Sequence, residues 1–217
     1  MDEAYEIFDY LPIRKSRIEE DYIEHLWNAF LILSGSGNSS RPFALMPFHL
    51  LFMLALQYRV LRIARKKIGD FSLAFTMESR ITSGQKGPHN PESVFDLALL
   101  PESKIIDLLK LIGLGQDRVK AIKELVKNRN DNLAHAKGGI DSDPDGKIGQ
   151  YLESLRSLQP QILLLNDGIA EEWEKEITSE DDLNEFIEGR LLDTYLCPAD
   201  MQQGKLAELD KHLNGFI

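Results

Sequence analysis

The sequence contains little cysteine and few strand-forming patterns, and these two shortages narrow the possible fold classes. A single cysteine, Cys197, excludes an internal disulfide framework and is typical of a reducing compartment. We interpret Cys197 as a small, half-buried apolar residue before Pro198. Alternating apolar and polar runs are scarce, and no internal repeat is visible. The 217-residue chain, 43% hydrophobic, is therefore expected to fold as an all-α protein with a sizeable core.

The sequence also lacks the features of a targeting segment or a membrane span. Residues 1–9 are acidic where the start of a signal peptide would be cationic. The longest apolar run, around residues 43–56, is interrupted by Pro47 and His49 and is expected to be too short to span a bilayer. We therefore expect a cytoplasmic protein with no membrane partner.

Signatures of cofactor and metal sites are missing as well. There is no glycine-rich phosphate loop and no serine nucleophile elbow, and Gly113 and Gly115 are more simply a helix break because no strand precedes them. No cofactor is predicted. The histidines are too widely scattered for a zinc site, at His25, His49, His89, His135 and His212. His25 and His49, which lie in amphipathic helices, are interpreted as packed or half-exposed spectators.

One aspartate-rich stretch resembles the start of a calcium loop. It contains Asp141, Asp143 and Asp145, followed by Gly146. Pro144 interrupts the pattern, and clusters of Asp and Gly are usually turns. We therefore interpret residues 138–146 as a turn-rich loop and predict no metal ligands.

Helix signals divide the chain into a lead-in of residues 1–15, a helical domain of residues 16–177 and an acidic helical extension of residues 178–217, expected to pack on the domain. Ser16 with Glu19 forms a capping box before the first helix.

The second helix is expected to begin at Pro47 and to end at Gly69 as a left-handed C-cap. Residues 70–82 fit either a helix or a strand. The spacing then predicts short helices near 91–100 and 103–112, a helix over 116–136, and a long helix over 148–177 that Pro160 can kink.

Charge is distributed unevenly along the chain, whose net charge is −10. Residues 58–67 contain five cations and no acid, and residues 118–137 contain six cations against two acids, so basic charge concentrates on two helices. Residues 171–188 contain nine acids and one lysine. We interpret this acidic segment as a solvated helix face; the alternative is that it shields a basic cleft by imitating phosphate charge.

The helix over 116–136 carries the most unusual pattern. Its buried face is predicted from apolar residues at three- and four-residue steps, namely Val119, Ile122, Val126, Leu133 and Ala136. Arg129 falls in the same series. A guanidinium on an apolar stripe costs free energy unless a partner receives its charge.

Two interpretations of Arg129 and His135 follow from spacing alone. In the first, Arg129 pairs with Asp131 or an acid elsewhere, while His135 caps a helix end near Gly138. In the second, both residues bind a ligand. Six residues correspond to about 240° of helical rotation. The two side chains then require a distorted helix end or a second copy of the chain to meet one small ligand.

The residues Arg129-Asn130-Asp131-Asn132-Leu133-Ala134-His135 resemble the signature of the HEPN superfamily, in which an arginine, commonly followed by a polar residue, precedes a histidine by four to six positions. The resemblance covers about residues 16–175 as a fold and only 129–135 as a motif. It implies an HEPN-like helical bundle whose homodimer cleaves RNA without a metal ion. Arg129 of each copy would hold the scissile phosphate, His135 would act as general base or acid, and Asn130 would orient the pair.

The resemblance also implies roles for the neighbouring residues and a class of partner protein. Residues that would support the site or contact RNA are Lys127, Asn128, Asp131, Asn132 and Lys137. Lys137 stands where relatives paired with a nucleotidyltransferase antitoxin often have a tyrosine, so regulation through that tyrosine is not predicted. Many relatives are toxins or antiviral defence proteins, which suggests an antitoxin or another defence-system protein as a partner. The alternative is a non-catalytic helical module that binds a nucleotide or a protein.

Overall fold

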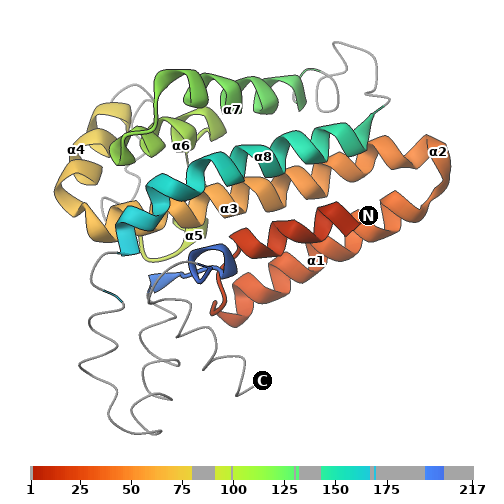
Figure 1. Cartoon of the computed structure of the whole chain (residues 1–217), viewed down its shortest axis with the longest axis horizontal. Coiled ribbons are helices and arrows are strands. Elements are labelled where there is room, and N and C mark those ends of the chain that lie inside the picture. Colours follow the sequence, from red (N-terminus) through yellow and green to blue (C-terminus); the bar gives the residue numbers. More distant parts are fainter. Residues whose placement is uncertain are drawn as a thin grey trace, which may run out of the picture.

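The computed structural model describes residues 2–79, 91–98, 100–129, 131, 143–166, 169 and 194–202, and every regular element in these ranges is helical. The all-α prediction is therefore confirmed. The helices form a bundle in which α3 (Leu45–Lys66) runs through the middle (Figure 1). On its sides lie α1 (Arg17–Gly35) and α8 (Pro144–Leu163), and α6 (Glu102–Leu108) also packs against it.

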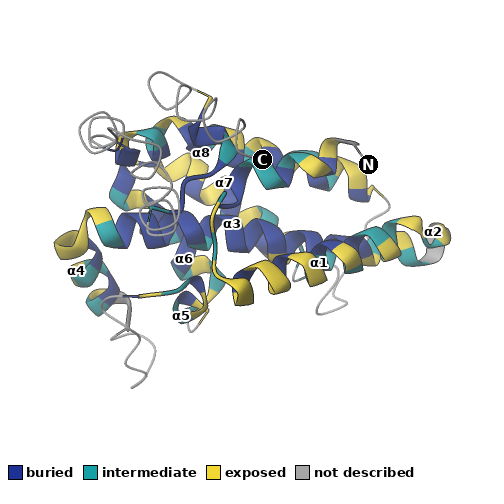
Figure 2. Ribbon diagram, turned by 90° about the horizontal axis from the view of Figure 1, so that it is seen from below, coloured by how far each residue is buried: buried dark blue, intermediate teal, exposed yellow. Residues whose placement is uncertain are grey.

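The central helix is buried along almost its whole length, as Figure 2 shows. A one-turn helix α2 (Gly37–Ser40) and a 3-10 turn η2 (Arg41–Ala44) lead into it. Residues Arg41–Lys66 are long and apolar enough to cross a membrane by length and composition, so the expectation that this run is too short does not hold for the helix as it forms. Within its most apolar window 83% is buried inside the bundle. Most of its apolar side chains therefore pack against other helices of the bundle.

The first helix begins as the sequence predicts. The Ser16 hydroxyl accepts a hydrogen bond from the Glu19 amide at 3.4 Å, and the Glu19 carboxylate accepts one from the Ser16 amide at 2.9 Å. The capping box is therefore confirmed. Residues of the lead-in form a 3-10 helix, η1 (Asp2–Tyr10), which packs on α8 and fully buries Ile7.

The end of α3 differs from the sequence-based expectation. The helix stops at Lys66, and Lys67 caps it with φ −126°, so no left-handed residue is needed there. Gly69 instead lies inside α4 (Ile68–Ser79), which makes the predicted C-cap at Gly69 wrong and shows that this ambiguous segment is helical through Ser79. Pro47 is the third residue of α3 rather than the first.

The predicted short helices in the middle of the chain are present. They are α5 (Val94–Leu97), and α6 continued by the 3-10 turn η3 (Leu109–Ile112). Gly113 follows with φ 77°, the left-handed conformation that glycine adopts without strain. This turn sends the chain into α7 (Gln116–Arg129), which packs against α6 and α8.

The last long helix starts earlier than predicted. Asp143 caps α8 by accepting a hydrogen bond from the Gly146 amide at 3.0 Å, and Pro144 takes the first helical position, where no amide hydrogen is required. Residues 144–146 are therefore helix, not loop. A Cβ on Gly146 would lie 2.2 Å from the Asp143 carboxylate, so a larger residue there would have to displace the capping side chain.

The C-terminal part of the chain is described in two pieces. The turn η5 (Leu164–Asn166) follows α8, and residues 194–202, with the 3-10 turn η7 (Pro198–Asp200), return to pack on η1 and α8. The predictions for residues 132–142 and 170–177 and for the acidic segment 171–188 lie outside the described residues.

Candidate functional site

Packing of α7 brings Arg129 against α6 and α3. Val119, Ile122 and Val126 are buried, as their spacing predicts. The Lys123 ammonium pairs with the Asp107 carboxylate at 2.6 Å and joins α7 to α6. Arg129, the last residue of α7, continues the buried face at the end of the helix.

The Arg129 guanidinium meets two polar side chains from other helices. Its Nη2 lies 2.5 Å from Oε1 of Glu102 and 2.6 Å from Nε2 of His49. The Arg129 side chain is 11% exposed and that of Glu102 is 30% exposed. The charge is thus compensated inside the chain, by an acid elsewhere in the fold. Burial of Arg129 without a counter-charge would have required a partner outside the chain. Because Glu102 supplies the counter-charge, no such partner is needed.

His49 connects this ion pair to the interior of the bundle. Its Nε2 lies 3.0 Å from Glu102 Oε1, and its Nδ1 lies 3.1 Å from the Tyr151 hydroxyl. At Nε2 the carboxylate requires a donor, whereas the guanidinium requires an acceptor. A neutral imidazole meets only one of these demands, so the position of the His49 proton is coupled to the Arg129–Glu102 pair.

The electrostatic environment sets the charge of each group. Burial lowers the pKa of His49, and the nearby Glu102 carboxylate only partly opposes this shift. Burial acts to raise the pKa of Glu102, but the hydrogen bonds and charges of His49 and Arg129 outweigh it, and the pKa is lowered. At neutral pH the cluster therefore consists of a cation, an anion and a neutral imidazole.

Part of the hydrogen-bonding capacity of Arg129 remains unused. Its Nε is buried without a partner, and no hydrogen bond joins its Nη1 to another residue in the described ranges. A guanidinium has five N–H donors in a rigid plane. While Nη2 faces Glu102 and His49, the Nη1 side can donate to an oxyanion.

The other residues predicted for this site fall into two groups. Lys127 and Asn128 are exposed near the end of α7, and Asp131 is half-buried. The remaining four, Asn130, Asn132, His135 and Lys137, lie outside the described residues. The structure therefore joins Arg129 to residues that the motif does not contain.

Sequence reasoning missed His49, Glu102 and Tyr151. His49 was interpreted as a spectator; it is fully buried and contacts Arg129 directly. One signal could have revealed it, because an ionisable residue on an apolar helix face requires a partner, the same argument that singled out Arg129. Glu102 carries no comparable signal.

A second arginine cluster occupies the other half of α3. Arg62 donates to Asp200 at 2.7 Å and to the Asn166 amide oxygen. Arg59 donates to the Gln159 side chain at 3.2 Å, and Gln159 donates to Asp200 at 2.6 Å. Arg59 and Arg62 are 1% and 5% exposed, so two of the five cations of the basic segment 58–67 lie inside the bundle.

Cys197 belongs to this second cluster. Its backbone amide donates to Asp200 at 3.0 Å, and its thiol donates to the same carboxylate at 3.2 Å. Burial raises the pKa of the thiol to about 11. The residue is fully rather than half buried, and its thiol is not activated.

The aspartates of the possible calcium loop have other roles where they are described. Asp143 caps α8, and Asp145 forms an ion pair with Arg41. Asp141 lies outside the described residues.

Comparisons of the chain with models of protein families, with characterised proteins and with solved structures gave no match. The resemblance of residues 129–135 to the HEPN signature thus rests on the motif and on the helical fold alone.

Proposed function

We propose that this chain is an HEPN-like helical protein that cleaves RNA without a metal ion, through attack by the ribose 2′-hydroxyl. The observation that carries the proposal is the placement of Arg129 of the Arg-Asn…His motif. Its guanidinium is held at the end of α7 by Glu102 and His49, and the Nη1 donors remain unused among the described residues. Such an arrangement holds the guanidinium in place and leaves it donors that could bind a phosphate, which supports the proposal.

In this mechanism Arg129 would donate from Nη1 to a non-bridging phosphate oxygen and would stabilise the charge that develops there. Glu102 and His49 would act as positioning residues, because they touch the guanidinium and not the substrate. A guanidinium fixed by a carboxylate does not have to reorganise as charge builds up on the phosphate, which is the condition for effective electrostatic catalysis.

His135 would take the proton from the 2′-hydroxyl or give one to the leaving oxygen, since an ordinary imidazole pKa near 6.5 suits both steps. Asn130 would orient the Arg129 and His135 side chains. Because Arg129 and His135 are six residues apart, we propose that two copies of the chain form the site together. A reaction that uses the 2′-hydroxyl is confined to RNA.

The charge distribution agrees with a local rather than a general affinity for RNA. The net charge of −10 disfavours binding over the whole surface, whereas Lys127 lies exposed one half-turn before Arg129. We propose a role in the cytoplasm as a toxin or an antiviral defence protein, held in check by an antitoxin or another protein of that system.

A second candidate function is favoured by one specific observation. The ion pair with Glu102 compensates the Arg129 charge without any ligand. In a non-catalytic helical module that binds a nucleotide or a protein, this pair would have a purely structural role.

The experiment that separates the two candidates measures decay of single-stranded RNA in EDTA. We expect the wild-type protein to cleave RNA but not DNA of the same sequence, and the variant Arg129→Ala/His135→Ala to lose at least about 100-fold in rate. Circular dichroism verifies that the variant is folded. A His135→Ala variant, which keeps the Arg129–Glu102 pair, should lose activity as well.

A matched control replaces one lysine and one histidine away from the site. Lys120→Ala/His25→Ala changes an exposed residue on α7 and an exposed residue on α1, and it should cleave like the wild type. Equal RNA decay in all samples would identify a contaminating nuclease and leave the non-catalytic module as the function.

A further inference from the structure

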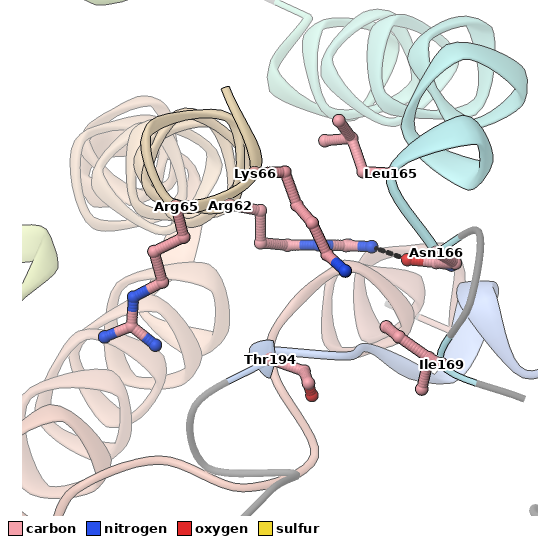
Figure 3. Close-up of a pocket in the computed structure, with 7 residues that line it drawn as sticks. All are labelled: Arg62, Arg65, Lys66, Leu165, Asn166, Ile169 and Thr194. Atoms are coloured by element: carbon pink, nitrogen blue, oxygen red, sulfur yellow. Dashed lines mark hydrogen bonds between the residues drawn. The ribbon is translucent and has the colours of Figure 1, made fainter. Parts of the chain in front are cut away.

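We propose that a pocket at the C-terminal end of α3 binds a single phosphate group. The pocket lies between the last turns of α3, the η5 turn and Thr194, and it is separate from the Arg129 cluster (Figure 3). Thirteen residues of α3 separate His49 from Arg62, which corresponds to about 20 Å along the helix. The proposal does not depend on the ribonuclease activity.

Among the residues that the structure describes, the polar lining of the pocket consists of side chains that can donate hydrogen bonds and contains no acid. The cavity has a volume of about 70 Å³, and its polar side chains are Arg62, Arg65, Lys66, Asn166 and Thr194. Arginine, lysine and amide N–H groups are the partners that proteins use for phosphate oxygens. Asp200 pairs with Arg62 and is not among the described residues that line the cavity, and no ion pair joins Lys66 to another described residue.

Asn166 supplies the observation that points to a ligand. The Arg62 guanidinium donates to the Asn166 Oδ1 atom, and because a guanidinium can only donate, this contact fixes the orientation of the amide. The Nδ2 atom then faces away from Arg62. This atom is buried, the residue being 7% exposed, and it has no hydrogen-bond partner in the part of the chain that the structure describes. A buried amide donor without an acceptor is costly, and an oxyanion in the adjoining cavity would satisfy it.

Lys66 provides the charge that can respond to a ligand. In the view of Figure 3 its side chain crosses that of Arg62, and it forms no ion pair within the described ranges. Arg65 turns away in that view: it donates to the Glu92 carbonyl at 3.2 Å and covers the Tyr195 ring at 4.6 Å. We therefore assign the main ionic contact to Lys66.

The size of the cavity limits the ligand to one small anion. A water molecule needs about 10–15 Å³ of such space, and whole small-molecule ligands occupy about 300–1,000 Å³. The cavity of about 70 Å³ lies between these values. It suits a phosphate group, either free inorganic phosphate or the terminal phosphate of an RNA chain whose remainder stays outside.

Isothermal titration calorimetry of the full chain with inorganic phosphate, at constant ionic strength in chloride, tests the site. We expect saturable one-to-one binding to the wild type. Lys66→Met, which keeps the length of an exposed side chain and removes its charge, should bind at least about tenfold more weakly. The control Lys120→Met makes the same charge change on an exposed part of α7 and should bind like the wild type.

A second variant tests the amide separately. Asn166→Asp keeps an acceptor for Arg62 but replaces the Nδ2 donors by a carboxylate oxygen, so we expect phosphate binding to disappear while the protein stays folded. Absence of saturable binding by the wild type would overturn the proposal. Binding that persists unchanged in both Lys66→Met and Asn166→Asp would also overturn it.

Two arms of the experiment distinguish the sources of the phosphate. RNA oligonucleotides with 2′-O-methyl riboses, which the proposed nuclease cannot cleave, are compared with a 5′-phosphate and with a 5′-hydroxyl. A preference for the 5′-phosphate that Lys66→Met abolishes identifies an RNA end as the source. Equal binding of the two oligonucleotides, together with Lys66-dependent binding of inorganic phosphate, identifies the free anion.

Discussion

The two arginine clusters of this protein use the same chemistry at different depths. Arg62 and Asp200, at 5% and 0% exposure, pair inside the bundle, whereas the Glu102 partner of Arg129 is 30% exposed. Arg59 and Arg62 find acceptors in α8, η5 and the segment 194–202. Both clusters keep buried donors without a partner among the described residues, Arg59 Nε and Asn166 Nδ2 in the first and Arg129 Nε in the second. The two ion pairs therefore differ in how far solvent reaches the carboxylate, which is fully buried in one and partly exposed in the other.

The enclosed cluster has a clear structural task. The Arg62–Asp200 ion pair joins residues 138 positions apart, and the Ile13 amide donates to the Leu196 carbonyl at 2.8 Å beside it. Together these contacts fix the segment 194–202 against the bundle. The cluster of Arg129, Glu102 and His49 joins α3, α6 and α7 through one carboxylate oxygen. We therefore expect it to contribute less to the free energy of unfolding than the Arg62–Asp200 pair does.

Removal of the buried carboxylate should have the largest effect. Asp200→Ala leaves Arg62 charged and unpaired in the interior, and we expect the free energy of unfolding to fall by about 3–5 kcal/mol in urea titrations followed by circular dichroism. The double variant Arg62→Met/Asp200→Leu removes both charges and should be more stable than Asp200→Ala. Wild-type stability of Asp200→Ala would contradict the structural role of this cluster.

Neutralisation of the half-exposed carboxylate should cost less. Glu102→Gln keeps hydrogen-bonding atoms near Arg129 and His49, and solvent screens part of the lost charge, so we expect a loss of about 1 kcal/mol. The pKa of His49, followed by NMR, should fall further because the raising effect of Glu102 is lost.

The exposed pair of Arg156 with Glu153, where Glu153 is 70% exposed, provides a control, since Glu153→Gln should leave stability unchanged. A loss from Glu102→Gln as large as that from Asp200→Ala would remove the distinction between the two clusters.

The smallest expected effect concerns pH. The pKa of His49 is lowered in the folded state, so below about pH 6.5 the unfolded chain binds more protons than the folded one. Stability should therefore fall as pH decreases from 7 to 5. His49→Gln removes this contribution and should lose about 1 kcal/mol less than the wild type over that range.

Urea titrations of both proteins at pH 7 and pH 5 measure the difference. The lowered pKa values of Glu102 and Asp200 add a further loss of stability only at lower pH, as pH falls through the range in which carboxyl groups titrate. Parallel losses in the two proteins would show that His49 does not titrate differently on folding.

Features that depend on interactions within a few residues are predicted correctly from the sequence. The capping box of Ser16 and Glu19 spans three residues, and the buried face of Val119, Ile122 and Val126 spans two turns. Gly69 shows where such reading fails: glycine is compatible with a C-cap, but α3 ended earlier and a new helix began at once. The sequence places the start of α8 at residue 148 instead of Pro144, because Asp143 and Pro144 are common both in turns and at the first positions of helices.

The sequence by itself determined that the chain is helical and that Arg129 requires a partner for its charge, because helix periodicity and the cost of burying a guanidinium act within a few residues. Only the tertiary structure decided which residues receive that charge. Glu102 and His49 lie 27 and 80 positions from Arg129 in the sequence, and the packing of three helices brings them into contact with it. It also decided that Arg59 and Arg62 face inward, because most of the acceptors that make their burial possible come from chain segments between 49 and 138 positions away.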